Sequence, residues 1–142
     1  MRAKQYLMQL ASIDHDIAAK RRQLDRLRED SYSLRGIAYD GGRVQSSPTG
    51  SGVEDKAIAL VAVQKDLETK IVDYHEARAR IETQISALPD KRYRDILTLR
   101  YVDGLTIQGA ASVMGYDYVW ACKLHGTALL CFERMWLSKS RQ

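Results

Sequence analysis

The side chains that could perform metal or acid–base chemistry are scattered along this 142-residue sequence. None of its three histidines has a cysteine or acidic partner at the spacing that metal sites use; they are His15, His75 and His125. No serine, cysteine or carboxylate has the neighbours that nucleophilic or general acid–base catalysis requires. The stretch GSGVEDK lacks both the spacing of a phosphate-binding loop and a preceding strand. We therefore expect no enzyme, no metal site and no cofactor.

Basic side chains offer a second kind of chemistry, the binding of a polyanion. The chain has 22 lysines and arginines against 18 aspartates and glutamates, a net charge of +4 and a pI of about 9.1. Residues 1–35 and 90–142 each hold eight basic and five acidic side chains, whereas residues 36–89 hold six and eight. The excess at the two ends permits a nucleic-acid partner without proving one.

Helices must position these residues. A long heptad pattern indicates the first of these helices. Apolar residues follow one another at alternating spacings of four and three from Tyr6 to Leu34, with Lys20 and Ser31 as polar interruptions. No glycine or proline falls within this stretch. The pattern predicts a single helix with one narrow apolar seam.

A second long helix is predicted from residue 53 to residue 88. The glycine- and serine-rich segment before it, residues 36–52, predicts a loop. Ser51 and Glu54 fit a capping box at the helix start, and Pro89 ends the helix. Narrow apolar stripes need partners, so we expect residues 1–88 to form an antiparallel helical hairpin or coiled coil, with homo-oligomers through the coiled coil as a further possibility.

Short elements follow in a second predicted domain, residues 89–142. An amphipathic helix over 90–102 precedes a helix capped by Thr106, a left-handed stop at Gly115, and a third helix capped by Asp117. Two helices joined by a turn of about three residues have helix-turn-helix geometry. We expect their shared core to comprise Val113, Met114, Ala121, Leu124 and Ala128. The fold class is therefore all-α, with a long helical hairpin followed by a helix-turn-helix domain.

The segment LPDKRYRDILTLRYVDGLTIQGAASVMGYDYVWACKLHGTALLCF is similar to region 4, the C-terminal promoter-recognition region of bacterial sigma factors. The whole chain resembles the sigma-like late-transcription regulators of phages and prophages of Gram-positive bacteria, the group that includes the ArpU and RinA types. That resemblance rests on the loop VQSSP, Val44 to Pro48, and on LHGTAL, Leu124 to Leu129. It implies promoter binding and contact with host RNA polymerase in the bacterial cytoplasm, at the nucleoid.

The resemblance also places candidate DNA contacts. The base-reading positions at the start of the recognition helix fall on Tyr118, Val119, Trp120, Cys122 and Lys123. Sigma factors usually have arginine or glutamate at several of these positions, but here only Lys123 is charged. Val119 could touch a thymine methyl group and Lys123 a guanine or a phosphate, whereas Trp120 could equally pack against the hairpin or a partner protein. Candidates for phosphate contacts beside the reading helix are Lys91, Arg92, Arg94, Arg100 and Thr106.

The predicted function is sequence-specific binding of double-stranded promoter DNA by a phage transcription activator or sigma-like accessory factor. No segment before residue 88 resembles the sigma region that melts promoters, so we expect the chain to need host polymerase. Two alternatives are a phage small terminase subunit, which would assemble as a ring on packaging DNA, and a module that binds polymerase or a repressor instead of DNA. No stretch approaches the roughly 20 apolar residues of a membrane span, so no membrane partner is expected.

Overall fold

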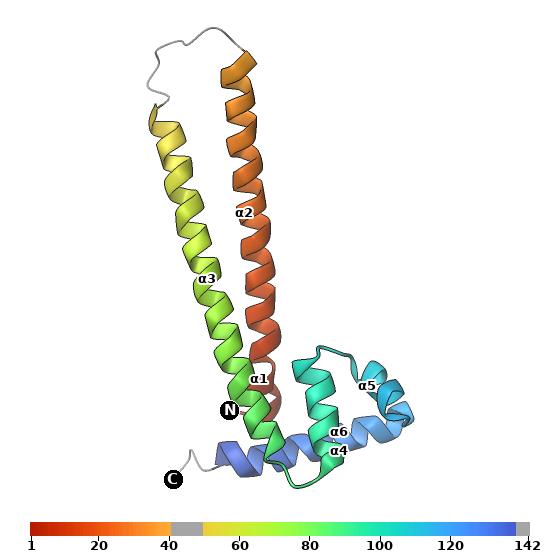
Figure 1. Cartoon of the computed structure of the whole chain (residues 1–142). Helices are drawn as coiled ribbons and strands as arrows, with labels where there is room; N and C mark the ends of the chain where they lie inside the picture. Colours follow the sequence, from red (N-terminus) through yellow and green to blue (C-terminus); the bar gives the residue numbers. More distant parts are fainter. Residues whose placement is uncertain (41–49, 139–142) are drawn as a thin grey trace. The chain divides into compact units, whose positions relative to one another are not determined.

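The computed structural model describes residues 1–40 and 50–138, and every regular element in these ranges is a helix (Figure 1). In chain order the elements are α1 (Ala3–Leu7), α2 (Gln9–Asp40), α3 (Gly50–Ser86), α4 (Lys91–Leu97), η1 (Thr98–Val102), α5 (Ile107–Met114), α6 (Tyr118–Phe132) and η2 (Glu133–Leu137). The short elements η1 and η2 are single wide π-helical turns that continue α4 and α6. The all-α prediction is confirmed.

The chain divides into two compact units. The first comprises Met1–Asp14 and Asp73–Gln142, and the second comprises His15–Val72. The first residues of α2 and the last residues of α3 therefore belong to the unit that contains α4, α5 and α6. This division by contacts differs from the boundary at residue 88, which was expected from the change in sequence pattern.

In the second unit, α2 and α3 run antiparallel. Lys20 Nζ lies 3.5 Å from Asp66 Oδ2, and Lys70 Nζ lies 3.6 Å from Asp16 Oδ2. Four residues forward along α2 thus correspond to four residues back along α3. Outside residues 31–51 and 53, the buried apolar side chains of this unit are Ile17, Leu24, Val63 and Leu67. Lys20, a polar interruption of the predicted seam, holds one of the two ion pairs.

Helices α2 and α3 are both longer than predicted at the ends that adjoin the predicted loop. Helix α2 continues to Asp40 and α3 begins at Gly50, so the expected loop over 36–52 is too long at both ends. Ser51 lies inside α3 rather than at its N-cap. A glycine inside a helix is unfavourable by only about 1 kcal/mol, so glycine content alone did not locate these ends. Residues 41–49, which include the VQSSP match, lie outside the described residues.

The first unit has a core that joins the start of the chain to its end. Side chains from seven elements and from the connection after α3 meet in it; they include Ala3, Leu7, Leu10, Ala77, Ile81, Ile85, Leu88, Ile96, Leu97, Ala128 and Phe132. The Tyr6 and Phe132 rings are 5.8 Å apart. The Tyr6 hydroxyl donates to Gln84 Oε1 at 2.7 Å, and Trp136 Nε1 donates to the Gln84 carbonyl at 3.1 Å. These contacts fix the ends of α1, α3 and α6 to one another.

Candidate nucleic-acid interface

Helices α5 and α6 form a two-helix motif whose turn is fixed by local contacts. The Thr106 hydroxyl accepts a hydrogen bond from the Gly109 amide at 3.0 Å and so caps α5. Gly115 adopts the left-handed conformation, with φ of 75° and ψ of 27°, and stops α5. Asp117 Oδ1 then accepts from the Trp120 amide at 2.6 Å and caps α6. All three predicted signals are confirmed, and together they set the direction of α6 after a three-residue turn.

Small residues let the two helices of the motif approach closely. Ala110, Ala111, Ala121 and Ala128 are all buried, and Leu124 is buried with them. Val113 was expected to join this core, but 66% of its surface is exposed. The buried residues of α5 are Ala110 and Ala111, and a helix of about 3.6 residues per turn puts Val113 on a different side from them. The prediction for Val113 is therefore wrong.

A buried polar pair connects α6 to η1. Tyr101 and His125 share a hydrogen bond of 2.8 Å between the Tyr101 hydroxyl and His125 Nε2, and their rings stack with centroids 5.6 Å apart. Burial lowers the pKa of His125, and the positive charges of Arg100 and Lys4 lower it further. Burial also raises the pKa of Tyr101. The pair is therefore held neutral, which suits its place in the core.

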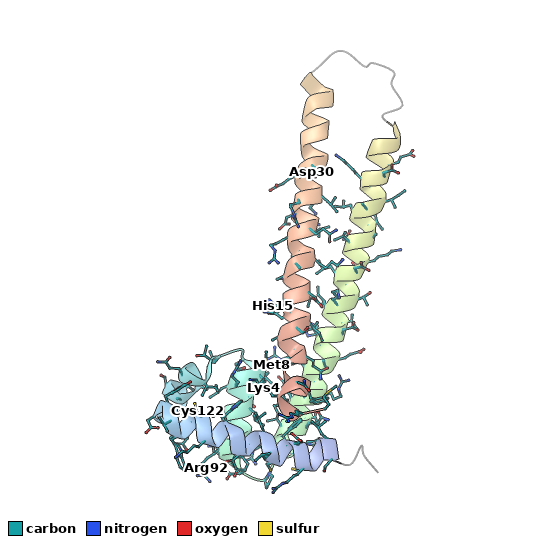
Figure 2. The ribbon with its side chains drawn as sticks, turned by 180° about the vertical axis from the view of Figure 1, so that it is seen from behind. Lys4, Met8, His15, Asp30, Arg92 and Cys122 are labelled. Atoms are coloured by element: carbon teal, nitrogen blue, oxygen red, sulfur yellow. The ribbon has the colours of Figure 1, made fainter. Side chains whose placement is uncertain are left out.

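The outer face of α6 consists of exposed residues, most of them uncharged. It comprises Val119, Trp120, Lys123, Gly126, Thr127 and Leu130. Trp120, whose direction the sequence left open, has 47% of its surface exposed, and Val119 has 62%. Within this set Lys123 alone carries a charge. Cys122, which Figure 2 labels on α6, is half-buried beside the face, and its thiol forms no disulfide.

The four basic candidates before the motif separate into two pairs. Lys91 and Arg92 are exposed at the start of α4, where Figure 2 labels Arg92. The Arg92 guanidinium lies 3.0 Å from Asp90 Oδ2, and this contact lowers the pKa of Asp90 and raises the pKa of Arg92. Because about half of the Arg92 side chain stays exposed, it can still meet a phosphate.

The other pair is engaged within the fold. Arg94 Nη1 donates to the Leu88 carbonyl at 2.6 Å, just after α3 ends. Arg100 Nη1 donates to the Leu105 carbonyl at 3.3 Å, and its guanidinium carbon lies 5.3 Å from the centre of the Tyr101 ring. Both arginines are half-buried. Sequence reasoning could not find these roles, since each depends on a carbonyl brought close by a turn.

A surface hollow of about 460 Å³ brings three of the candidate residues together. Arg100, Thr106 and Tyr118 line it, with Ile107 and Gln108 between them. Tyr118 is 56% exposed, and a hydrogen bond with the Cys122 side chain raises the pKa of its hydroxyl. The hollow combines a guanidinium, a hydroxyl-capped helix start and a phenol. These groups suit an anion such as a backbone phosphate.

The described residues contain no group of three or more histidine, cysteine or acidic side chains that could hold a metal ion. Over the same ranges, no helix is both long enough and apolar enough to cross a bilayer. Comparison of the chain with protein-family models, with curated protein sequences and with solved structures finds no match.

Proposed function

We propose that the protein is a sequence-specific DNA-binding transcription regulator that places the outer face of α6 in the major groove. The observation that carries the proposal is the construction of the two-helix motif. A capped α6 follows a left-handed glycine turn, and its first residues, Tyr118, Val119 and Trp120, are exposed. Helix-turn-helix proteins read bases with the N-terminal residues of the second helix.

Phosphate contacts in this proposal come from outside α6. Lys91 and Arg92 are the exposed cations at the start of α4, and Arg100 lies in the hollow with Thr106. Arg94 has a structural role instead, because it satisfies the Leu88 carbonyl. This division supports a reading helix with little charge, since phosphate contacts position a protein while base contacts specify the sequence.

The biological setting rests on the resemblance to sigma region 4 and to phage late-transcription regulators. The protein would act in phage or prophage gene expression together with host RNA polymerase. Because no segment before residue 88 resembles the sigma region that melts promoters, the host polymerase and its sigma factor open the DNA in this proposal. Sequence-specific transcription from core polymerase plus this protein alone would contradict that part of the proposal.

The test uses a duplex selected from a random pool by the full chain. Lys123→Ala should relax the preference for particular base pairs, because Lys123 is the charged residue of the outer face. Lys91→Ala should weaken binding to all duplexes alike and reduce the steepness of the salt dependence by about one unit. Lys65→Ala, at an exposed position of α3, is the matched control and should change neither. If Lys123→Ala leaves the base preference intact, the base-reading role of Lys123 is refuted.

A protein-binding module is the second candidate, and the apolar outer face favours it. Val119, Trp120 and Leu130 are each about half exposed or more, and exposed aromatic and aliphatic groups are typical anchors of protein interfaces. Such a module would bind polymerase or a repressor without binding DNA. Absence of binding to any duplex at low salt, combined with loss of polymerase binding by Trp120→Ala, would favour this candidate.

A further inference from the structure

The side chains of α6 exclude most of the ways in which a helix reads base pairs. Arginine reads guanine, asparagine or glutamine reads adenine, and an acidic group accepts from cytosine. Between Tyr118 and Phe132 the sequence YVWACKLHGTALLCF contains none of these five residue types. Lys123 is the residue left to contact guanine. Apart from the Tyr118 and Thr127 hydroxyls and the Trp120 indole N–H, the remaining exposed side-chain groups of α6 are apolar, and the apolar feature of the major groove is the thymine methyl group.

The one hydroxyl on the outer face already donates its proton within α6. Thr127 Oγ1 donates to the Lys123 carbonyl at 3.0 Å, one turn earlier in α6. Its methyl group and the acceptor side of its hydroxyl oxygen then remain for an outside partner. Val119 and Leu130, exposed by 62% and 57%, add branched aliphatic groups to the same face. The face is therefore matched to methyl groups more than to hydrogen-bonding edges.

Gly126 supports the close approach of an outside surface. A Cβ atom built on Gly126 would meet no atom within 4 Å, so packing within the described residues does not require a glycine there. Glycine in the middle of a helix is unfavourable by about 1 kcal/mol relative to alanine. A glycine at this position is explained if another molecule lies against the helix backbone, as a duplex does when a helix enters its groove.

Spacing places these groups along a short run of base pairs. Val119, Lys123, Gly126 and Leu130 follow at intervals of four, three and four residues, which puts them on one side of a helix. With a rise of about 1.5 Å per residue, Val119 and Gly126 are about 10 Å apart along α6. That distance corresponds to about three base steps of about 3.4 Å. Lys123 lies between them.

We propose that the outer face of α6 recognises thymines by their C5-methyl groups, so that the target is a short A·T-rich element with at most one guanine read by Lys123. This inference rests on the proposed function, because it assumes that α6 enters the major groove. Val119 makes the first methyl contact, and Thr127 and Leu130 make contacts further along. Trp120 covers the neighbouring sugar and base edge at the rim of the groove.

The experiment replaces thymines in the selected duplex, one at a time, by deoxyuridine, which differs only in lacking the C5-methyl group. Each contacted thymine should lower the affinity about fourfold when replaced, the effect of removing one buried methyl group. In Val119→Ala the loss at one particular thymine should shrink towards onefold, because the methyl contact is already gone. Val61→Ala, at a valine of α3 that is 50% exposed, is the matched control and should keep the full loss.

The outcomes separate the inference from the function on which it rests. If the full chain selects a duplex but every deoxyuridine substitution leaves its affinity unchanged, methyl recognition is refuted and DNA binding stands. A selected element that is rich in G·C pairs would refute methyl recognition in the same way. If no duplex is selected at low salt, the proposed function fails and the inference fails with it.

Discussion

Acid should destabilise the first unit through His125. His125 is 8% exposed and shares a hydrogen bond with the Tyr101 hydroxyl, and the positive charges of Arg100 and of the exposed Lys4 act on it from outside the core. Burial and these charges hold its pKa below the ordinary value of about 6.5. In the unfolded chain the imidazole regains that ordinary pKa and takes up a proton first as the pH falls.

The direction and size of the effect follow from proton linkage. A group whose pKa is lower in the folded state contributes its full stability above the unfolded pKa, and this contribution is lost as the pH falls from there towards the folded pKa. For one proton the free energy of unfolding changes by at most about 1.4 kcal/mol per pH unit. We therefore expect the stability that His125 contributes to be complete above about pH 7 and to be lost as the pH falls below about 6.5.

Urea denaturation followed by circular dichroism, repeated at intervals from pH 8 to pH 5.5, measures this slope. His125→Gln should flatten the slope and, at pH 8, lower stability by about 1–3 kcal/mol through the loss of a well-paired buried group. His75→Gln changes an exposed histidine of α3, and should keep the slope of the unaltered protein. A free energy of unfolding that stays constant over this range, or a slope that survives His125→Gln, would refute the reasoning.

Three further predictions concern the two-helix motif and the core beneath it. Asp117→Ala removes the cap of α6 and should lower the free energy of unfolding by about 1 kcal/mol in urea titrations; an unchanged value would mean that the cap is not needed. Gly126→Ala should raise stability by up to about 1 kcal/mol yet weaken DNA binding, and a variant that binds as well as the original would contradict the proposed close approach. Phe132→Ala empties a fully buried position and should cost about 3–5 kcal/mol, and an unchanged free energy of unfolding would mean that Phe132 does not hold the core together.

The sequence predicted most of the motif because its signals are local. Thr106, Gly115 and Asp117 act on amides within three residues or on their own backbone angles, so a short stretch of sequence contains all the required information. Helix ends in the glycine-rich segment were less predictable, because glycine weakens a helix without determining where it stops.

Contacts between distant parts of the chain were not predictable in the same way. Tyr6 packs against Phe132, and Tyr101 bonds to His125, yet neither pair has a local sequence pattern. The expected phosphate role of Arg94 likewise could not take into account the Leu88 carbonyl beside it. These features depend on how several helices meet, which a heptad pattern or a turn signal does not specify.

The most direct test of sequence-specific DNA binding is the selection of duplexes from a random pool by the full chain, at low salt and again at physiological salt. We expect an enriched element rich in thymine, with an affinity that falls steeply as salt rises, because Lys91, Arg92 and Arg100 release counterions from the duplex. Failure to enrich any element even at low salt would contradict this expectation.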